Sequence, residues 1–313
     1  MTALCSRSWQ RKYQWRKMAE TGHTVSDQNF QRVVETQGKL MERFSKLPRE
    51  SLAEDLLNVN KPREQLEILC RYLPDKNLNN KKLLEIGSGL GIFQLVARKE
   101  YHMDPWGVEP SGEGFMDSLD ICCSILNDNG VSCDQIMNAQ GEQLPFKDNS
   151  FDIVFSTNAL EHVHNEAAVI HEAIRVCKPG GIIQIVVPNF GSFFDGHYAC
   201  FYVPYQPKWL WKSYVKYILR RDPSFVNSLG TNINYFSVRR ILNRYRAQVE
   251  VLTYGSEIFM ERMESLSFTP WAGLIKVKGW LSITKKLHLN SLLARCLIFI
   301  KAFTPLILTL KKL

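Results

Sequence analysis

Leu84-Glu85-Ile86-Gly87-Ser88-Gly89-Leu90-Gly91 carries the strongest structural signal in this chain of 313 residues. Residues 83–86 form a short, mostly apolar run, which is typical of a buried parallel strand. Glycines follow at every second position, and a backbone without Cβ atoms can turn sharply and come close to a ligand. Ligands of open α/β sheets bind at the carboxyl ends of such strands. The stretch therefore predicts a ligand site at the carboxyl edge of a parallel sheet.

The spacing of these glycines argues against a dinucleotide. The dinucleotide-binding loop has the pattern G-x-G-x-x-G, whose third glycine leaves a helix N-terminus free for a pyrophosphate. Ile92 stands at that third position, and Glu85 precedes the first glycine by two residues. A carboxylate repels phosphate but favours a cation, or a ligand that offers N–H and O–H donors. S-adenosylmethionine, with its sulfonium and ammonium, meets that requirement, although the loop alone fits any strand–helix turn.

Three further motifs follow along the chain. A second predicted strand ends in Glu109, whose carboxylate can accept both hydroxyls of a ribose. Residues 140–146 lead into an apolar strand at 151–156, and Asn158 follows at the end of that strand. Residues 175–181 then close a helix and turn through Pro-Gly-Gly into another apolar strand. Together with the glycine loop, these motifs predict repeated returns to one edge of a sheet.

With these four motifs in this order and spacing, the chain resembles the class I S-adenosylmethionine-dependent methyltransferases, in particular the group called methyltransferase type 11. The resemblance covers residues 61–189 and continues more weakly to residue 279. It implies an α/β fold with a doubly wound, mostly parallel seven-stranded sheet, the Rossmann-like methyltransferase fold. It also implies S-adenosylmethionine as the methyl donor, S-adenosylhomocysteine as the product, and transfer by in-line displacement.

The resemblance implies one set of cofactor-binding residues: Glu85, Gly87, Ser88, Gly89, Gly91, Glu109, Pro110, Ser111, Gln140, Gly141, Glu142 and Asn158. Glu85 and the glycine loop would contact the methionine part, and Glu109 the ribose hydroxyls. Residues 110–111 and 140–142 would lie along the adenine, and Asn158 would close the floor near the methionine. The family usually has Asp where Gln140 stands; Gln keeps a carbonyl acceptor but brings no charge.

Charge is distributed unevenly along the chain. The net charge is +8, and the residues after Glu264 hold eight basic side chains and no acid, so everything up to Glu264 sums to zero. A neutral core argues against an RNA or DNA substrate, because a nucleic-acid site needs basic residues around it. We expect a small-molecule or lipid-like acceptor, with protein as an alternative, and the oligomeric state stays open.

Cysteine usage predicts a reducing compartment. Eight cysteines are scattered without a C-x-x-C pair or a zinc-like Cys/His spacing, so we expect reduced thiols, a cytoplasmic protein and no metal site. No apolar segment typical of a secretory signal peptide follows the N-terminus. The first nineteen residues are basic and lack acids, which fits a frayed end or a mitochondrial targeting segment.

Periodicity predicts three segments. Residues 1–60 form a helical cap that covers the cofactor, residues 61–279 the methyltransferase domain, and residues 280–313 an apolar, basic tail. Apolar runs alternate with helical stretches, which favours a parallel sheet. The expected strands are 83–86, 104–109, 133–137, 151–156, 182–187, 249–252 and 274–278.

A long insertion, residues 189–235, follows the fifth predicted strand and is crowded with aromatic residues. This connection leaves the sheet at the ligand end, and long loops there are usually functional. Acceptor pockets are mostly apolar and aromatic, so we interpret the insertion as an acceptor lid. The alternative is a structural flap that only packs on the core.

The tail combines apolar and basic residues without acids. Residues 296–310 are nearly all apolar, but Lys301 and Pro305 interrupt them, so the run is too short for a membrane-spanning helix. Two interpretations stay open: a peripheral membrane contact, with lysines meeting anionic headgroups, or a buried helix or oligomer contact. Membrane-facing residues of the insertion could add to the same surface: Trp209, Trp211, Lys212 and Lys216.

Methyl transfer requires the acceptor atom to be held in line and water to be excluded, and a general base helps when the acceptor is a hydroxyl or an acidic carbon. Candidates follow the fourth and fifth strands. His197 and Tyr198 in the insertion are the preferred pair, and His162 is a third candidate beside Glu161 and His164. A lone histidine is more often packed or solvated than catalytic.

Three functions compete. The leading hypothesis is an enzyme, a methyltransferase acting on a small or lipid-like acceptor. The second is a binding module that keeps the cofactor without catalysis, against which the intact glycine loop and Glu109 argue. The third is an NAD-dependent oxidoreductase, which the missing third glycine disfavours.

Overall fold

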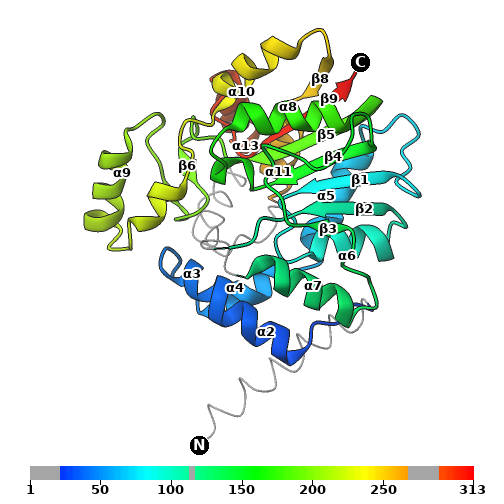
Figure 1. The fold of residues 1–313 in the computed structure, drawn as a ribbon. Helices are drawn as coiled ribbons and strands as arrows, with labels where there is room; N and C mark the ends of the chain where they lie inside the picture. Colours follow the sequence, from blue (N-terminus) through cyan, green and yellow to red (C-terminus); the bar gives the residue numbers. More distant parts are fainter. Residues whose placement is uncertain (1–21, 113–116, 267–288) are drawn as a thin grey trace, which may run out of the picture.

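The computed structural model describes residues 22–112, 117–266 and 289–313. A central seven-stranded sheet has the strand order β3-β2-β1-β4-β5-β9-β8 (Figure 1). Its strands are β1 Lys82–Ile86, β2 Asp104–Val108, β3 Ile136–Met137, β4 Phe151–Thr157, β5 Cys177–Val187, β8 Val249–Thr253 and β9 Leu306–Lys312. All expected strands up to 249–252 are present, the third as only two residues.

The pairing makes the sheet mostly parallel. β1 to β5 pair in parallel, whereas β9 runs antiparallel to both of its neighbours, β5 and β8. The strand order reverses between β1 and β4, which is the point where open sheets bind ligands. The predicted fold class, a doubly wound, mostly parallel sheet, is therefore confirmed.

Helices cover both faces of the sheet, because β1 presents apolar side chains on each face. Leu83 packs into a cluster with α5 and α6, while Leu84 and Ile86 pack into the opposite cluster with α8 and α10. The core helices are α5 Asn60–Cys70, α6 Ile92–Lys99, α7 Ser118–Asp128, α8 Glu166–Val176 and α10 Tyr235–Leu242.

The N-terminal described residues are helical, as the sequence predicts: α2 Asp27–Val33, η1 Val34–Gly38, α3 Lys39–Glu42 and α4 Arg49–Leu56. Figure 1 shows them beside α7. Asn29 donates to Asp128 at 2.7 Å, and Gln37 donates to Ser118 at 2.8 Å. These bonds fasten the segment to the helix that follows β2.

The insertion folds around its own aromatic core. Its elements are β6 Phe194–Asp195, β7 Cys200–Phe201, α9 Lys208–Ser213, η3 Tyr214–Ile218 and η4 Ser224–Ser228. Tyr198, Tyr202 and Trp211 are fully buried. Phe225 stacks on Phe44, with ring centroids 4.2 Å apart, so the insertion also contacts the N-terminal segment.

The C-terminal region differs from the expectation of a separate tail. Residues 274–278, expected as the seventh strand, lie outside the described residues, and β9 Leu306–Lys312 occupies the sheet position beside β5. Five of its residues are buried because both faces of the strand are covered. The central sheet therefore includes residues 306–312, which were expected to belong to the tail.

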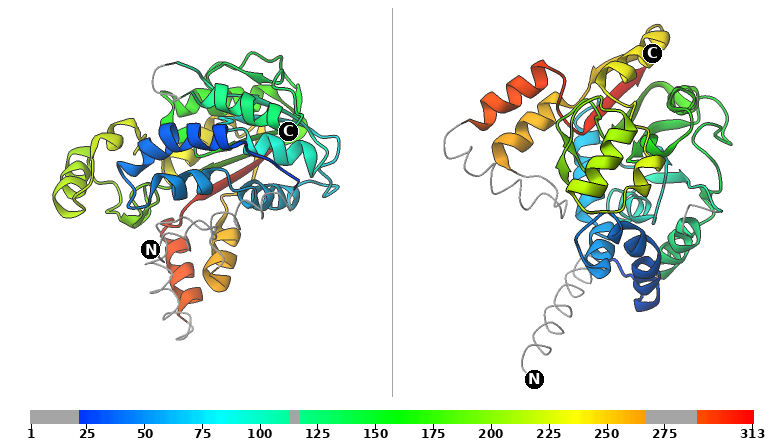
Figure 2. Two further views of the ribbon diagram at one scale, coloured as in Figure 1. Left: turned by 90° about the horizontal axis from the view of Figure 1, so that it is seen from below. Right: turned by 90° about the vertical axis from the view of Figure 1, so that its left-hand side faces the viewer.

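Two helices precede β9. α11 Ser256–Ser265 and α13 Asn290–Phe299 pack side by side and stand away from the sheet (Figure 2). On α13, the side chains of Leu292 and Phe299 are exposed. Within the described residues, none of the helices is long and apolar enough to cross a membrane.

The cysteine expectation is also corrected. Cys123 of α7 and Cys133 of the following loop form a disulfide, with Cα atoms 5.1 Å apart. The pairing depends on how the chain after α7 folds back, which cysteine spacing alone does not indicate. The free thiols among the described residues are Cys70, Cys122, Cys177, Cys200 and Cys296.

Candidate functional site

The glycine loop joins β1 to α6 through left-handed backbone angles. The φ angles are +84° at Gly87, +52° at Gly89 and +77° at Gly91. A Cβ on Gly87 would lie 2.8 Å from the Cβ of Ala159, and one on Gly91 would lie 2.6 Å from the sulfur of Cys122. A Cβ on Gly89 would meet nothing within 4 Å among the described residues. Two glycines thus serve packing, while Gly89 borders open space.

Glu85 is a buried acid beneath the loop. Its carboxylate accepts a hydrogen bond from Gln94 Nε2 at 2.8 Å, and the same nitrogen also contacts the carbonyl of Trp106 at 3.1 Å. Burial raises the pKa of Glu85 to about 8, and the nearby charge of Glu109 adds to the shift. A cation beside this carboxylate would stabilise its ionised form.

Glu109 ends β2 beside the same loop. Its Oε2 accepts the backbone N–H of Gly89 at 2.9 Å, and its side chain is buried. Burial raises the pKa of Glu109, while the Gly89 bond partly opposes that shift. The carboxylate thus lies next to the open space at Gly89.

These residues fit S-adenosylmethionine. Glu109 presents oxygens that can accept the ribose hydroxyls, as acids at this position do in nucleotide sites. The open side of Gly89 leaves room for a ligand against the backbone. Glu85 offers a negative partner for the ammonium group and would repel a pyrophosphate.

The predicted adenine edge is only partly free. Gln140 is exposed, whereas Glu142 accepts the backbone N–H of His164 at 2.9 Å and so supports the loop before α8. Ser111 is held by Asn138, whose Oδ1 accepts its backbone N–H at 3.0 Å. Asn138 was missed by the sequence analysis, because an isolated Asn before the 140–146 motif carries no signal.

The carboxyl end of β4 leads directly to a second group of polar residues. Asn158 has φ +51°, and its backbone N–H donates to Val186 at 2.9 Å. Ala159 packs against Gly87, and the short helix η2 Leu160–His162 follows. Glu161 and His162 therefore lie only two and three residues along the chain from Ala159, which packs against the glycine loop.

His197 of the insertion joins these two residues. One ligand atom from each of Glu161, His162 and His197 lies within 4.8 Å of the others. Within this group, His197 Nε2 lies 3.9 Å from Glu161 Oε1. We call these three residues the acceptor cluster. The insertion brings Phe225 beside them, 5.6 Å from the His197 ring and 5.9 Å from the His162 ring.

The acceptor cluster is electrostatically coupled. Burial raises the pKa of Glu161 to about 7, partly opposed by the charge of His197. Desolvation by the surrounding residues lowers the pKa of His162 to about 4, although part of its side chain is exposed, and His197 adds to that shift. For His197, burial acts downward, but the hydrogen bond and charge of Asp195 and the charge of Glu161 outweigh it and raise the pKa.

The structure separates Tyr198 from the other two predicted catalytic residues, His162 and His197. The hydroxyl of Tyr198 donates to the carbonyl of Asp222 at 2.8 Å, and its ring packs on Trp211 and Phe44. Tyr198 therefore stabilises the insertion from within, and these contacts do not bring it to Glu161 and His162. Asp195 fixes both neighbours: its Oδ2 accepts the backbone N–H of Tyr198, and its Oδ1 contacts Nδ1 of His197. The His197 side chain therefore lies on Asp195, away from the Tyr198 ring.

Sequence reasoning missed Asp195, Gln94 and Phe225. Gln94 lies about one helical turn after the loop and donates to Glu85. Of the three residues, it came closest to being predictable from the sequence. Asp195 and Phe225 come to the site only through the fold of the insertion.

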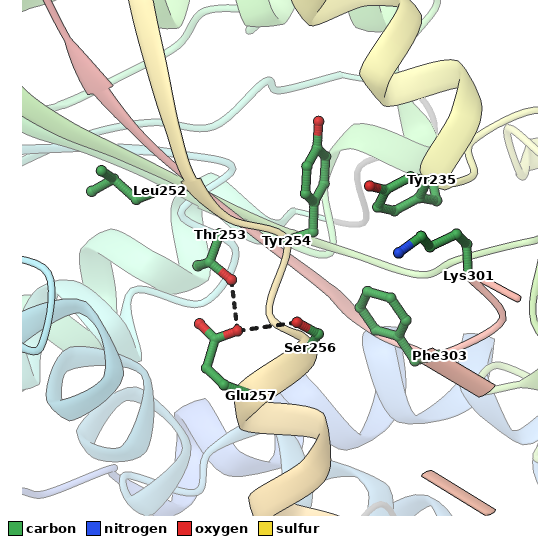
Figure 3. A pocket seen from close by; sticks show the side chains of 8 residues that line it. All are labelled: Tyr235, Leu252, Thr253, Tyr254, Ser256, Glu257, Lys301 and Phe303. Atoms are coloured by element: carbon green, nitrogen blue, oxygen red, sulfur yellow. Dashed lines mark hydrogen bonds between the residues drawn. The ribbon is translucent and has the colours of Figure 1, made fainter. Parts of the chain in front are cut away.

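A separate pocket lies at the far side of the sheet (Figure 3). It has a volume of about 290 Å³ and lies beside β8, the edge strand opposite β3. Glu257 accepts the Thr253 hydroxyl at 2.7 Å, and Lys301 lies 5.2 Å from the centre of the Tyr235 ring. Several of its polar groups are thus engaged with one another, and three strands, β4, β5 and β9, lie between β8 and the strand that precedes the glycine loop.

Comparison with known proteins identifies the class. Residues 84–185 match the family model described as a methyltransferase domain. An uncharacterised protein of Methanocaldococcus jannaschii, MJ1123, is 32% identical over 136 residues, which are 44% of this chain and 56% of that protein. Norajmaline N-methyltransferase of Rauvolfia serpentina is 31% identical over 112 residues, 36% of this chain and 37% of that enzyme. The chain therefore spans about half or less of these relatives.

A solved structure described as a putative sarcosine dimethylglycine methyltransferase from Galdieria sulphuraria covers 84% of this chain and 87% of its own, with 16% identity and a TM-score of 0.45. The strand order and the glycine loop define a class I methyltransferase fold. The match supports a class I methyltransferase domain of the type 11 group at residues 84–185.

Proposed function

We propose that this chain binds S-adenosylmethionine along the carboxyl ends of β1, β2 and β4 and transfers its methyl group to a small-molecule or lipid-like acceptor. The observation that carries this proposal is the placement of Glu109, which meets the Gly89 backbone beside open space. Glu85 provides a second carboxylate for the methionine end. When bound, S-adenosylmethionine supplies a methyl group on a positively charged sulfur.

The acceptor is held beside the acceptor cluster. Glu161 and His162 follow the strand whose end adjoins Gly87, so the cluster lies at the methionine end of the loop. His197 and Phe225 approach it from the insertion, which would exclude water from the reacting atoms. The aromatic surroundings suit an apolar acceptor with one polar, nucleophilic atom.

Relatives favour a small acceptor. Two of them are named as N-methyltransferases of norajmaline and ajmaline, with 31% and 26% identity to this chain. A nitrogen acceptor at this site would need positioning more than a strong base, because a neutral amine already carries the attacking lone pair. Without a bound metal ion, His162 and His197 would orient the acceptor and would remove a proton if its nucleophile is a hydroxyl.

One labelling experiment distinguishes the proposal from its two alternatives, a protein methyltransferase and a non-catalytic binding module. Purified protein is incubated with methyl-labelled S-adenosylmethionine and a total cell extract, and the label is separated into lipid, small-molecule, nucleic-acid and protein fractions. Label among lipids or small molecules supports the proposal. Label in protein supports a protein methyltransferase. Absence of label, together with S-adenosylhomocysteine binding, supports a non-catalytic module.

The surface of the insertion supports peripheral membrane contact. Trp209, Tyr217 and Ile218 are about two-thirds exposed, at 68%, 67% and 69%, and Lys216 lies among them. Exposed aromatic and basic side chains together favour an anionic membrane surface. Trp211, which the sequence assigned to this surface, is fully buried and takes no part in it.

Vesicle binding tests this contact. The protein should sediment with phosphatidylserine vesicles more than with phosphatidylcholine vesicles, and Ile218→Ser should reduce the bound fraction severalfold. Phe236→Ser, at another exposed aromatic position, is the control. Equal binding of both variants would remove the insertion from the proposed membrane surface.

A further inference from the structure

We propose that the acceptor cluster, Glu161, His162 and His197, binds a divalent first-row transition-metal ion of the zinc type. Two imidazoles and one carboxylate are a ligand set used for catalytic zinc and for non-haem iron. The proposal that an ion binds here is argued from the geometry of the three side chains alone. The ion's role in holding a nitrogen or oxygen of the acceptor rests on the proposed function.

The spacing of the three side chains suits a shared ion. Their ligand atoms lie within 4.8 Å of one another, and His197 Nε2 lies 3.9 Å from Glu161 Oε1. At 3.9 Å no direct hydrogen bond joins these two atoms. Ligands of tetrahedral zinc, each roughly 2.0–2.2 Å from the ion, are roughly 3.3 Å apart. Small side-chain rotations would therefore close the site.

The carboxylate of Glu161 is buried without a partner. Its side chain is 0% exposed, and neither carboxylate oxygen has a hydrogen-bond partner among the described residues. A buried charge without compensation is strongly unfavourable, and buried charges in proteins are paired or coordinate metals. His197 is the nearest described cation partner, and it is too far away to donate a hydrogen bond.

Both imidazoles are oriented by their other nitrogen. His197 Nδ1 lies 3.2 Å from Asp195 Oδ1, and Asp195 is itself fixed by the Tyr198 backbone N–H at 2.7 Å. His162 Nδ1 contacts the carbonyl of Ser228 at 3.4 Å. When Nδ1–H donates to such acceptors, the lone pair of Nε2 is free to bind a metal. The carboxylate–histidine–metal arrangement is a recurrent way to fix a ligating imidazole.

The site keeps one side open. His162 is exposed, whereas Glu161 is buried and His197 is nearly so. Three protein ligands with an open position are typical of catalytic rather than structural zinc sites. Imidazole ligands favour zinc or iron over magnesium and calcium, which prefer oxygen ligands. The open position is where an acceptor atom would bind.

Zinc binding by the full chain tests the proposal. Protein stripped with a chelator is titrated with Zn²⁺ in a calorimeter, and bound metal is counted after dialysis. We expect one equivalent of zinc, with an affinity at least 100-fold lower in Glu161→Gln and in His197→Gln. The control is His164→Gln, an exposed histidine two residues from His162, which should bind zinc like wild type.

Cobalt distinguishes this site from cysteine sites. Co²⁺ bound by the acceptor cluster should show visible d–d bands without a thiolate charge-transfer band, and the bands should disappear in Glu161→Gln. S-adenosylhomocysteine binding is measured in every sample, so that loss of the donor site is recognised separately. Absence of stoichiometric zinc in wild type, or equal zinc affinity in wild type and Glu161→Gln, would overturn the metal site while leaving the methyltransferase proposal intact.

Discussion

The donor edge and the acceptor cluster are built in different ways. The donor edge comes from one short part of the chain, in which Glu85, three glycines and Glu109 follow two neighbouring strands. The acceptor cluster joins η2 to an insertion that begins after β5. Backbone conformation constrains the first region, whereas long-range packing assembles the second. The donor edge could therefore be predicted from the sequence, whereas the acceptor cluster is recognised only in the folded structure.

The largest expected effect separates the two regions. Glu109→Ala should weaken S-adenosylhomocysteine binding by at least about 100-fold, because two hydrogen bonds to a charged acceptor contribute roughly 1.5–3 kcal/mol each. Isothermal titration calorimetry measures the loss. Glu261→Ala, which breaks only an exposed pair with Arg71, is the control. If Glu109→Ala bound normally, the assigned donor edge would be incorrect.

Two glycines should differ in what they control. Gly91→Ala should lower the free energy of unfolding by about 2–3 kcal/mol, since its Cβ would lie 2.6 Å from Cys122 Sγ at a φ of +77°. Gly89→Ala should lower it by only about 1–2 kcal/mol, the strain of a positive φ, but should weaken S-adenosylhomocysteine binding more strongly.

Urea denaturation of both variants, with and without S-adenosylhomocysteine, measures these effects. Adding Cys122→Ala to Gly91→Ala should recover part of the lost stability because the clash is removed. Identical stability and binding losses in the two glycine variants would mean that the loop has no distinct ligand-facing position.

The acceptor cluster should respond to a residue that does not itself belong to it. Asp195→Asn should lower zinc affinity about 10–100-fold, as replacement of a group that orients a ligating histidine does elsewhere. Binding of S-adenosylhomocysteine should change less than twofold. Competition with a zinc-chelating dye measures the first quantity and calorimetry the second. A loss of donor binding in this variant would show that the two regions are not independent.

A pH dependence is expected at Glu85. Its folded pKa of about 8 lies above its ordinary value of 4.5, so the folded state holds the proton that the unfolded state releases. The free energy of unfolding should therefore fall as pH rises from about 5 to about 8. The slope corresponds to one proton that is bound in the folded state and released in the unfolded state.

Glu85→Gln removes that contribution, and its amide oxygen can still accept from Gln94. The stability difference between the variant and wild type should grow with pH over the same interval, as measured by urea denaturation of the ligand-free proteins. A constant difference would mean that Glu85 ionises normally in the folded chain.

The donor edge and the acceptor cluster also differ in how much of each could be predicted from the sequence. Residues 83–91 predicted β1 and its turn because Gly87 and Gly91 have no space for a side chain. The alternation of apolar runs predicted the parallel sheet, and Glu109 was placed correctly at the end of β2. Local conformation and strand burial are short-range demands, so they leave a local pattern.

Other features depend on distant contacts. β9 was read as part of an apolar tail because a strand covered on both faces has no alternation to distinguish it. Tyr198 and His197 are neighbours in sequence, but Asp195 and Trp211 direct them to opposite uses. The disulfide between Cys123 and Cys133 and the convergence of Glu161 with His197 likewise depend on the folded insertion and loops.

A crystal structure of the chain with S-adenosylhomocysteine bound tests the central claim most directly. The account predicts that the ribose hydroxyls contact Glu109 and that the sulfur faces Glu161, His162 and His197. The donor and acceptor regions would then meet at the reacting atom. A ribose bound away from Glu109, or a sulfur turned away from this cluster, would contradict the account.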